Sequence, residues 1–141
     1  MTVISRKTFR VLIVDDDVAM QRLMRQAMIQ QGFACDTAND GVDADEQLAA
    51  GHYDAVVTDL VMPNKHGYAL ATQLLAQTPR PVIVVLTGVT EPRLADDLRG
   101  HGVDDVVYKP TNARALAVKV RELVERKSDK LTGWQGDKVT G

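Results

Sequence analysis

The sequence predicts an α/β domain in which helices cover both faces of a parallel sheet. Short apolar runs alternate with helical segments five times along the chain. The run at residues 55–57 is too short for a helix and is typical of a strand buried on both faces. Four of the runs end in acidic, hydroxyl or amine side chains, which matches the carboxyl edge of a parallel sheet, where α/β proteins bind ligands.

Each expected strand is followed by an expected helix. The strands are short, mainly apolar runs at residues 11–14, 33–38, 55–57, 82–86 and 106–108. The helices carry apolar residues at three- and four-residue spacing and are expected at residues 18–31, 42–50, 67–77, 92–99 and 113–126. We therefore expect one domain at residues 10–126, after a leader at 1–9 and before a polar, flexible tail or linker at 127–141.

Glycine, proline and asparagine mark the expected ends of the helices. Gly32 stands just after the first helix, where a C′ glycine belongs, and Gly51 stops the second. Pro81 helps to break the chain before the fourth strand. Pro92 can occupy the first turn of the fourth helix, and Asn112 can cap the fifth.

The composition is that of an ordinary soluble domain. The chain has 141 residues, 45% hydrophobic and 26% charged, with a net charge of −2 and no basic stripe interleaved with aromatics. This balance gives no reason to expect direct contact with nucleic acid or an anionic membrane. The single cysteine, Cys35, excludes an internal disulfide, and no apolar segment is long enough for a signal peptide or a membrane span. We expect a cytoplasmic protein.

Five side chains that could carry chemistry stand at four strand ends. They are Asp15 and Asp16 after the first strand, Asp59 at the third, Thr87 after the fourth and Lys109 after the fifth. Crowded carboxylates repel one another unless a cation compensates them. Mg²⁺ prefers carboxylate, water and phosphate oxygens, so the acids predict a magnesium site. A carboxylate can also attack phosphorus, which makes Asp59 a candidate phosphoacceptor.

The other polar groups would complement a phosphoryl group. Lys109 would neutralise its charge, and the Thr87 hydroxyl and the Gly88 amide would donate hydrogen bonds to it. Each residue taken alone has an ordinary structural interpretation, such as a turn aspartate or a solvated lysine. Their joint placement at one predicted edge favours the functional interpretation.

Over about residues 9–126 the chain resembles the receiver domain of bacterial two-component response regulators. The matching motifs are VLIVDDD with Asp15 and Asp16, VVTDLVMP with Asp59, the spacing Pro63-x-x-x-Gly67, VVLTG with Thr87, and YKP with Lys109 and Pro110. The resemblance implies a flavodoxin-like sheet of order 2-1-3-4-5. It also implies that Asp59 accepts a phosphoryl group from the phosphohistidine of a sensor histidine kinase or a histidine phosphotransfer protein.

The same resemblance implies the ligands and partners of the site. Asp16, Asp59 and the Val61 backbone carbonyl would bind Mg²⁺ with the help of Asp15, and a cis Lys109–Pro110 peptide would aim the lysine inward. Such a domain transfers a phosphoryl group only to itself and loses it slowly, so it is a signalling module rather than an enzyme. An output partner or a C-terminal output domain is expected, and homodimerisation stays an open alternative.

Two features depart from the family pattern. Val106 stands where the family usually has Tyr or Phe, and a short β-branched side chain cannot make the inward swing of that aromatic. Tyr108 lies two residues on, on the same strand face, so we expect switching by the Thr87 loop, with Tyr108 as substitute at the surface of the fourth helix, fifth strand and fifth helix. Val61 and Val89 replace frequent polar residues and predict a long-lived aspartyl phosphate.

Two other functions remain as alternatives. A haloacid dehalogenase-like phosphohydrolase also uses an acid at a strand end, but its motif Asp-x-Asp-x-Thr or Val would place Ala19 at the last position, and the chain is short for that fold. A degenerate interaction domain would keep the fold without phosphorylation. The complete set of acids, Thr87 and Lys109 argues against that alternative, whereas Val106 keeps it open.

Overall fold

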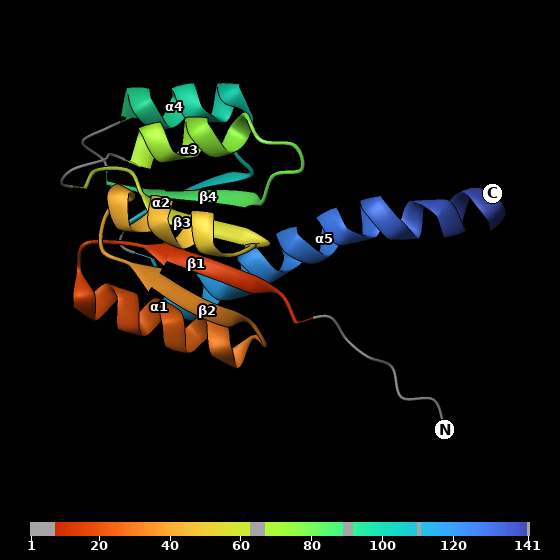
Figure 1. Ribbon diagram of the computed structural model, residues 1–141, viewed down its shortest axis with the longest axis horizontal. Coiled ribbons are helices and arrows are strands. Elements are labelled where there is room, and N and C mark those ends of the chain that lie inside the picture. The colour runs from red at the N-terminus through yellow and green to blue at the C-terminus, as the bar shows by residue number, and fades with distance from the viewer. Residues whose placement is uncertain (1–7, 63–66, 89–91, 110, 141) are drawn as a thin grey trace.

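The computed structural model describes residues 8–62, 67–88, 92–109 and 111–140, with side chains as far as Asp129. Five parallel strands form one sheet of order β2-β1-β3-β4-β5, which confirms the expected flavodoxin-like topology (Figure 1). The strands are β1 (Arg10–Val14), β2 (Ala34–Ala38), β3 (Ala55–Asp59), β4 (Val82–Thr87) and β5 (Asp105–Tyr108). The helices are α1 (Val18–Gln30), α2 (Gly41–Ala50), α3 (Gly67–Leu75), α4 (Pro92–His101) and α5 (Ala113–Thr140).

Helices cover both faces of the sheet, as the strand sequences predict. Figure 1 shows α3 and α4 on one side of the sheet and α1 and the first part of α5 on the other. Alternate side chains of β1 enter different cores: Leu12 and Val14 pack with residues of α2, α3 and α4, whereas Val11 and Ile13 pack with α1 and α5. All six residues of β4 are buried, which explains why the central strands are continuous apolar runs.

The last helix is longer than the sequence predicts. We expected it to end at Arg126, whereas α5 continues to Thr140 and its C-terminal part extends away from the sheet (Figure 1). The first part of α5 packs on the sheet through Leu116 and Val120 and supplies the nucleus from which a helix propagates at low cost. A glycine within a helix costs only about 1 kcal/mol, so the glycines beyond residue 132 do not force an end.

The other helix and strand bounds differ little from the expected ones. The largest differences are two residues each. They are the ends of β3, expected at residue 57 and observed at Asp59, of α3, expected at residue 77 and observed at Leu75, and of α4, expected at residue 99 and observed at His101. In the part of the chain that the structure describes, no helix combines the length and apolarity that a membrane crossing requires.

Candidate functional site

The polar strand ends meet at the carboxyl edge of the sheet because the strands are parallel and in register. Val14 of β1 pairs with Thr58 of β3, so the residues that follow them, Asp15 and Asp59, leave the sheet side by side. Thr87 of β4 pairs with Tyr108 of β5, which brings Lys109 to the same edge. The chain moves outward from β1 to β2 and returns to β3 on the other side of β1, so the site lies at the switch point of the topology, where open α/β sheets bind ligands.

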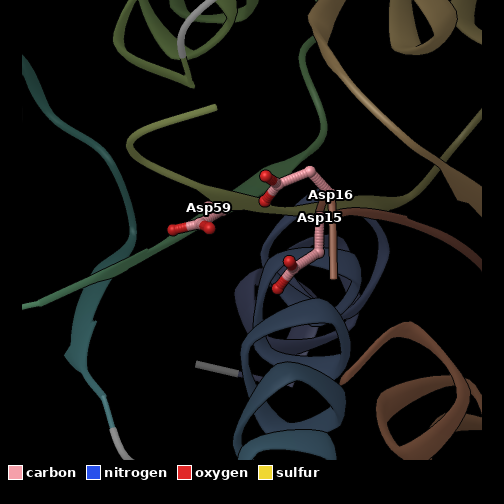
Figure 2. Close-up of side chains that lie close together, drawn as sticks. All are labelled: Asp15, Asp16 and Asp59. Atoms are coloured by element: carbon pink, nitrogen blue, oxygen red, sulfur yellow. The ribbon is translucent and has the colours of Figure 1, made fainter. Parts of the chain in front are cut away.

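The three predicted acids come together at this edge. One carboxylate oxygen each of Asp15, Asp16 and Asp59 lies within 4.8 Å of the other two. Figure 2 shows Asp15 and Asp16, from the loop after β1, beside Asp59 at the end of β3. Their exposure differs, because Asp15 is completely buried, Asp59 is partly buried and Asp16 is exposed. A ligand from solvent can therefore reach Asp16 and Asp59, while Asp15 forms the floor of the site.

Asp15 is a buried carboxylate with one oxygen that accepts no hydrogen bond. Its Oδ1 accepts a hydrogen bond of 2.9 Å from the Asp17 amide, whereas its Oδ2 has no hydrogen-bond partner. Burial raises the pKa of Asp15, although the hydrogen bond from Asp17 and the charge of Lys109 oppose this effect. A buried carboxylate oxygen without a hydrogen bond is costly. The all-oxygen donor set and this oxygen fit Mg²⁺, which prefers a few carboxylates together with water.

Lys109 reaches across the edge of the sheet to the acids. Its Nζ lies 3.0 Å from Asp59 Oδ2 and 3.6 Å from Asp15 Oδ2, and its backbone amide donates to the Thr87 carbonyl at 2.8 Å. Burial lowers the pKa of Lys109, but the hydrogen bond to Asp59 and the charges of both acids outweigh burial, so the pKa lies above its usual value. Lys109 is therefore a cation at neutral pH. The expected cis peptide to Pro110 lies outside the described residues.

The backbone around Asp59 is held from several directions. The Asp59 carbonyl accepts from the Thr58 hydroxyl at 2.9 Å, and the next amide, that of Leu60, donates to the Leu86 carbonyl at 2.8 Å. Gly67 at the start of α3 returns to this point and donates its amide to the Leu60 carbonyl at 3.0 Å. A Cβ atom at position 67 would lie 1.9 Å from the Asp59 carbonyl oxygen, so no side chain fits there.

The predicted switch residues occupy different environments. Thr87 is buried, and its hydroxyl donates to the Gly88 carbonyl at 3.1 Å. Val106 is buried in the core beneath α3 and α4, while Tyr108 is 40% exposed and its ring centroid lies 5.5 Å from Cζ of Arg99 in α4.

The structure also adds a residue that the sequence interpretation did not assign to the site. Asp17 caps α1, because its Oδ1 accepts from the amides of Ala19 at 3.0 Å and Met20 at 3.2 Å. The same residue's amide holds Asp15 Oδ1. Its sequence signal is an aspartate immediately before a helical periodicity, which is a typical N-cap. Val89 and Pro63, which the sequence interpretation also used, lie outside the described residues.

Comparisons with known sequences identify the family to which the chain is similar. Residues 11–121 match the family model described as response regulator receiver domain. The response regulator MprA of Mycobacterium leprae is 34% identical over 119 residues, which cover 83% of this chain and 51% of that protein. The transcriptional regulatory protein ResD of Bacillus subtilis is 28% identical over 119 residues, which cover 84% of this chain and 49% of that protein. The chain thus spans about half the length of these curated relatives.

Solved structures show the same fold. The response regulator protein TrrA of Thermotoga maritima, crystallised in complex with Mg²⁺ and BeF, superposes with a TM-score of 0.71 at 29% identity and covers 82% of this chain and 99% of that chain. A CheY-like receiver domain protein from Methanospirillum hungatei superposes with a TM-score of 0.81 at 22% identity and covers 88% of this chain and 99% of that chain. At that lower identity the likeness concerns the fold alone.

Proposed function

Since the chain belongs to the response regulator receiver domain family, a signalling module of two-component systems, we propose that Asp59 is its phosphoacceptor. The observation that carries the proposal is the arrangement around this carboxylate. Two further acids lie within 4.8 Å, and a cationic amine lies 3.0 Å away. The Asp59 side chain is 13% exposed, so a phosphoryl donor can approach it from solvent.

The proposed donor is the phosphohistidine of a sensor histidine kinase or of a histidine phosphotransfer protein. A carboxylate oxygen of Asp59 forms a bond to phosphorus while the bond between phosphorus and the imidazole nitrogen breaks. The electron pair of the broken bond stays on that nitrogen, which is protonated, and Asp59 becomes an acyl phosphate. Hydrolysis reverses the modification when water attacks phosphorus and releases inorganic phosphate and the Asp59 carboxylate.

The neighbouring groups support this transfer by charge and hydrogen bonding. Lys109 already contacts Asp59 Oδ2 and would stabilise the negative charge that accumulates on the phosphoryl oxygens. The Thr87 hydroxyl and the Gly88 amide would donate hydrogen bonds to those oxygens. Asp15, Asp16, Asp59 and the Val61 carbonyl would hold Mg²⁺, which when bound supplies positive charge to the phosphoryl oxygens.

In this structure the Thr87 hydroxyl donates to the Gly88 carbonyl. After phosphorylation of Asp59, the phosphoryl oxygens would compete with that carbonyl for the hydroxyl, and the change would be transmitted to a surface. Movement of Thr87 and the loop that follows it would alter the surface formed by α4, β5 and α5, where Tyr108 is exposed beside Arg99. Val106 is buried and short, so Tyr108 would be the aromatic that reports the change. If Tyr108→Ala left phosphorylation-dependent partner binding unchanged, the role of Tyr108 would be wrong.

The output of this switch would be a partner protein or a C-terminal output domain, because the curated relatives are about twice as long as the matched region. We place the protein in the cytoplasm, where kinases of two-component systems deliver their phosphoryl groups. The module would modify only itself and would not turn over a substrate.

The direct test is intact-mass measurement after incubation with Mg²⁺ and acetyl phosphate. We expect one added phosphoryl group in the unmodified protein and none in Asp59→Asn. If the protein were neither phosphorylated nor able to bind magnesium, the proposal would be contradicted. That result would favour a phosphorylation-independent interaction domain. Steady turnover of a generic phosphate ester would instead indicate a phosphohydrolase.

A further inference from the structure

Gln21 is a buried polar residue to which the mechanism above gives no role. Among the described residues, the buried polar or charged side chains are Asp15, Gln21, Thr58 and Thr87. The other three stand at strand ends in the site, whereas Gln21 belongs to α1 and is only 7% exposed. Burying an amide is unfavourable unless its hydrogen bonds are satisfied, so its partners indicate its purpose.

The two N–H groups of the Gln21 side chain face three acceptor oxygens that converge at the ends of two strands. Its Nε2 lies 2.5 Å from the Asp15 carbonyl oxygen, 2.8 Å from Asn39 Oδ1 and 3.2 Å from the Ala38 carbonyl oxygen. Two of these three partners are backbone carbonyl oxygens, which can only accept. The orientation of the amide is therefore determined, with its nitrogen toward the strand ends.

The Asp15 carbonyl needs such a donor because the pairing of β1 with β2 ends there. The paired register of β1 and β2 stops at Val14 and Ala38, and the Asp15 amide then donates to the Ala38 carbonyl at 3.1 Å. The register does not continue beyond this point, and Asp15 is buried, so its carbonyl cannot rely on water for a donor. Gln21, in the first turns of α1, supplies a donor to this carbonyl.

This contact constrains the loop that carries the acids. The loop runs from Asp15 to Asp17, and α1 begins immediately afterwards. At its far end, Asp17 is held as the cap of α1; at its near end, Gln21 holds the Asp15 carbonyl. The exposed Asp16 lies between these two restraints, so the position of its carboxylate depends on the backbone on both sides.

We infer that Gln21 is a positioning residue for the acidic loop, which holds Asp15 and Asp16 at the distance from Asp59 that a divalent cation requires. The inference rests on the proposed function, because Gln21 touches neither the cation nor the phosphoryl donor and acts through the Asp15 backbone. Removing a partner that orients metal ligands typically weakens metal binding by about 10- to 100-fold. Loss of the Gln21 amide is therefore expected to raise the dissociation constant for Mg²⁺ about tenfold.

The test compares Gln21→Met with Gln26→Met in the full chain. Methionine has nearly the length of glutamine but no donor, and Gln26 is an exposed residue of the same helix. Magnesium binding is measured by titration calorimetry at a temperature where circular dichroism shows each variant to be folded. We expect about tenfold weaker binding for Gln21→Met and unchanged binding for Gln26→Met. The Mg²⁺ concentration that half-saturates phosphorylation by acetyl phosphate should rise by the same factor.

A merely structural Gln21 would lower the melting temperature and leave the dissociation constant for Mg²⁺ unchanged, and this result would overturn the inference. If Gln21→Met does not fold, Gln21→Asn replaces it, because an amide one methylene shorter cannot reach all three acceptors. Unchanged magnesium binding in Gln21→Asn would also overturn the inference. Unmodified protein that binds no Mg²⁺ would contradict the proposed function itself and remove the inference with it. Normal binding in the unmodified protein and in both Gln21 variants would contradict the inference alone.

Discussion

Replacing Gly67 with alanine should disturb Asp59 directly, although position 67 is eight residues further along the chain. The added Cβ would meet the Asp59 carbonyl oxygen at 1.9 Å and the Asp59 carbonyl carbon at 2.9 Å. Both contacts are with backbone atoms, so no side-chain rotation can relieve them. The start of α3 or the end of β3 must move by about 1 Å or more to restore a normal contact.

The magnitude follows from two opposing effects. Alanine is favoured over glycine within a helix by up to about 1 kcal/mol, but Gly67 is the first residue of α3, where this gain is small. Overpacking a closely packed site costs about 1–3 kcal/mol. We expect Gly67→Ala to lower the free energy of unfolding by about 2 kcal/mol, and to slow phosphorylation of Asp59 because the carboxylate moves with its backbone.

Gly100→Ala is the matched control. A Cβ at position 100 in α4 would meet nothing within 4 Å, so this variant should be unchanged or more stable by at most about 1 kcal/mol. Urea denaturation gives the two free energies of unfolding, and acetyl phosphate labelling gives the rates. If Gly67→Ala matched the control in both stability and labelling rate, the argument from the close approach to Asp59 would be refuted.

Three further predictions concern the charged groups and the exposed valine of the site. Lys109→Ala should slow phosphorylation of Asp59 by about 100-fold, as loss of one charge-stabilising donor does in other active sites, whereas Lys119→Ala, at an exposed lysine, should not change the labelling rate. Because burial raises the pKa of Asp15, the folded protein holds that proton more tightly than the unfolded chain, so stability falls as pH rises between the two pKa values. In magnesium-free buffer Asp15→Asn should therefore be more stable than the unmodified protein at neutral pH. This advantage should disappear when the pH falls below the usual pKa of an aspartate. Equal stability of the two proteins at neutral pH, measured by denaturation, would contradict the prediction. Val61 is 47% exposed, and its apolar side chain cannot orient water. Val61→Asn should therefore shorten the lifetime of the acyl phosphate, measured as loss of label after the donor is removed. An unchanged lifetime would show that the valine does not protect the acyl phosphate.

Sequence reasoning located the strands, and it placed the candidate acids, Thr87 and Lys109 at one edge of the sheet, because both inferences depend on local patterns. A strand buried on both faces must be a continuous apolar run, as β3 and β4 are, and parallel strands deliver their last residues to one edge. The helix end at Arg126 was wrong because polar residues without apolar periodicity can still continue a helix that is already packed, as α5 does to Thr140.

The sequence by itself thus determined the fold class, and it predicted which acids, hydroxyl and lysine would gather at the candidate site. Only the tertiary structure decided which acid is buried, that Lys109 contacts Asp59 across 50 residues, and that Gln21 reaches Ala38 across 17. It also decided that Gly67 leaves no room for a side chain against the Asp59 carbonyl. The physical reason is that composition and periodicity encode which face of an element is buried, whereas such distances depend on strand register and on where each helix returns to the sheet.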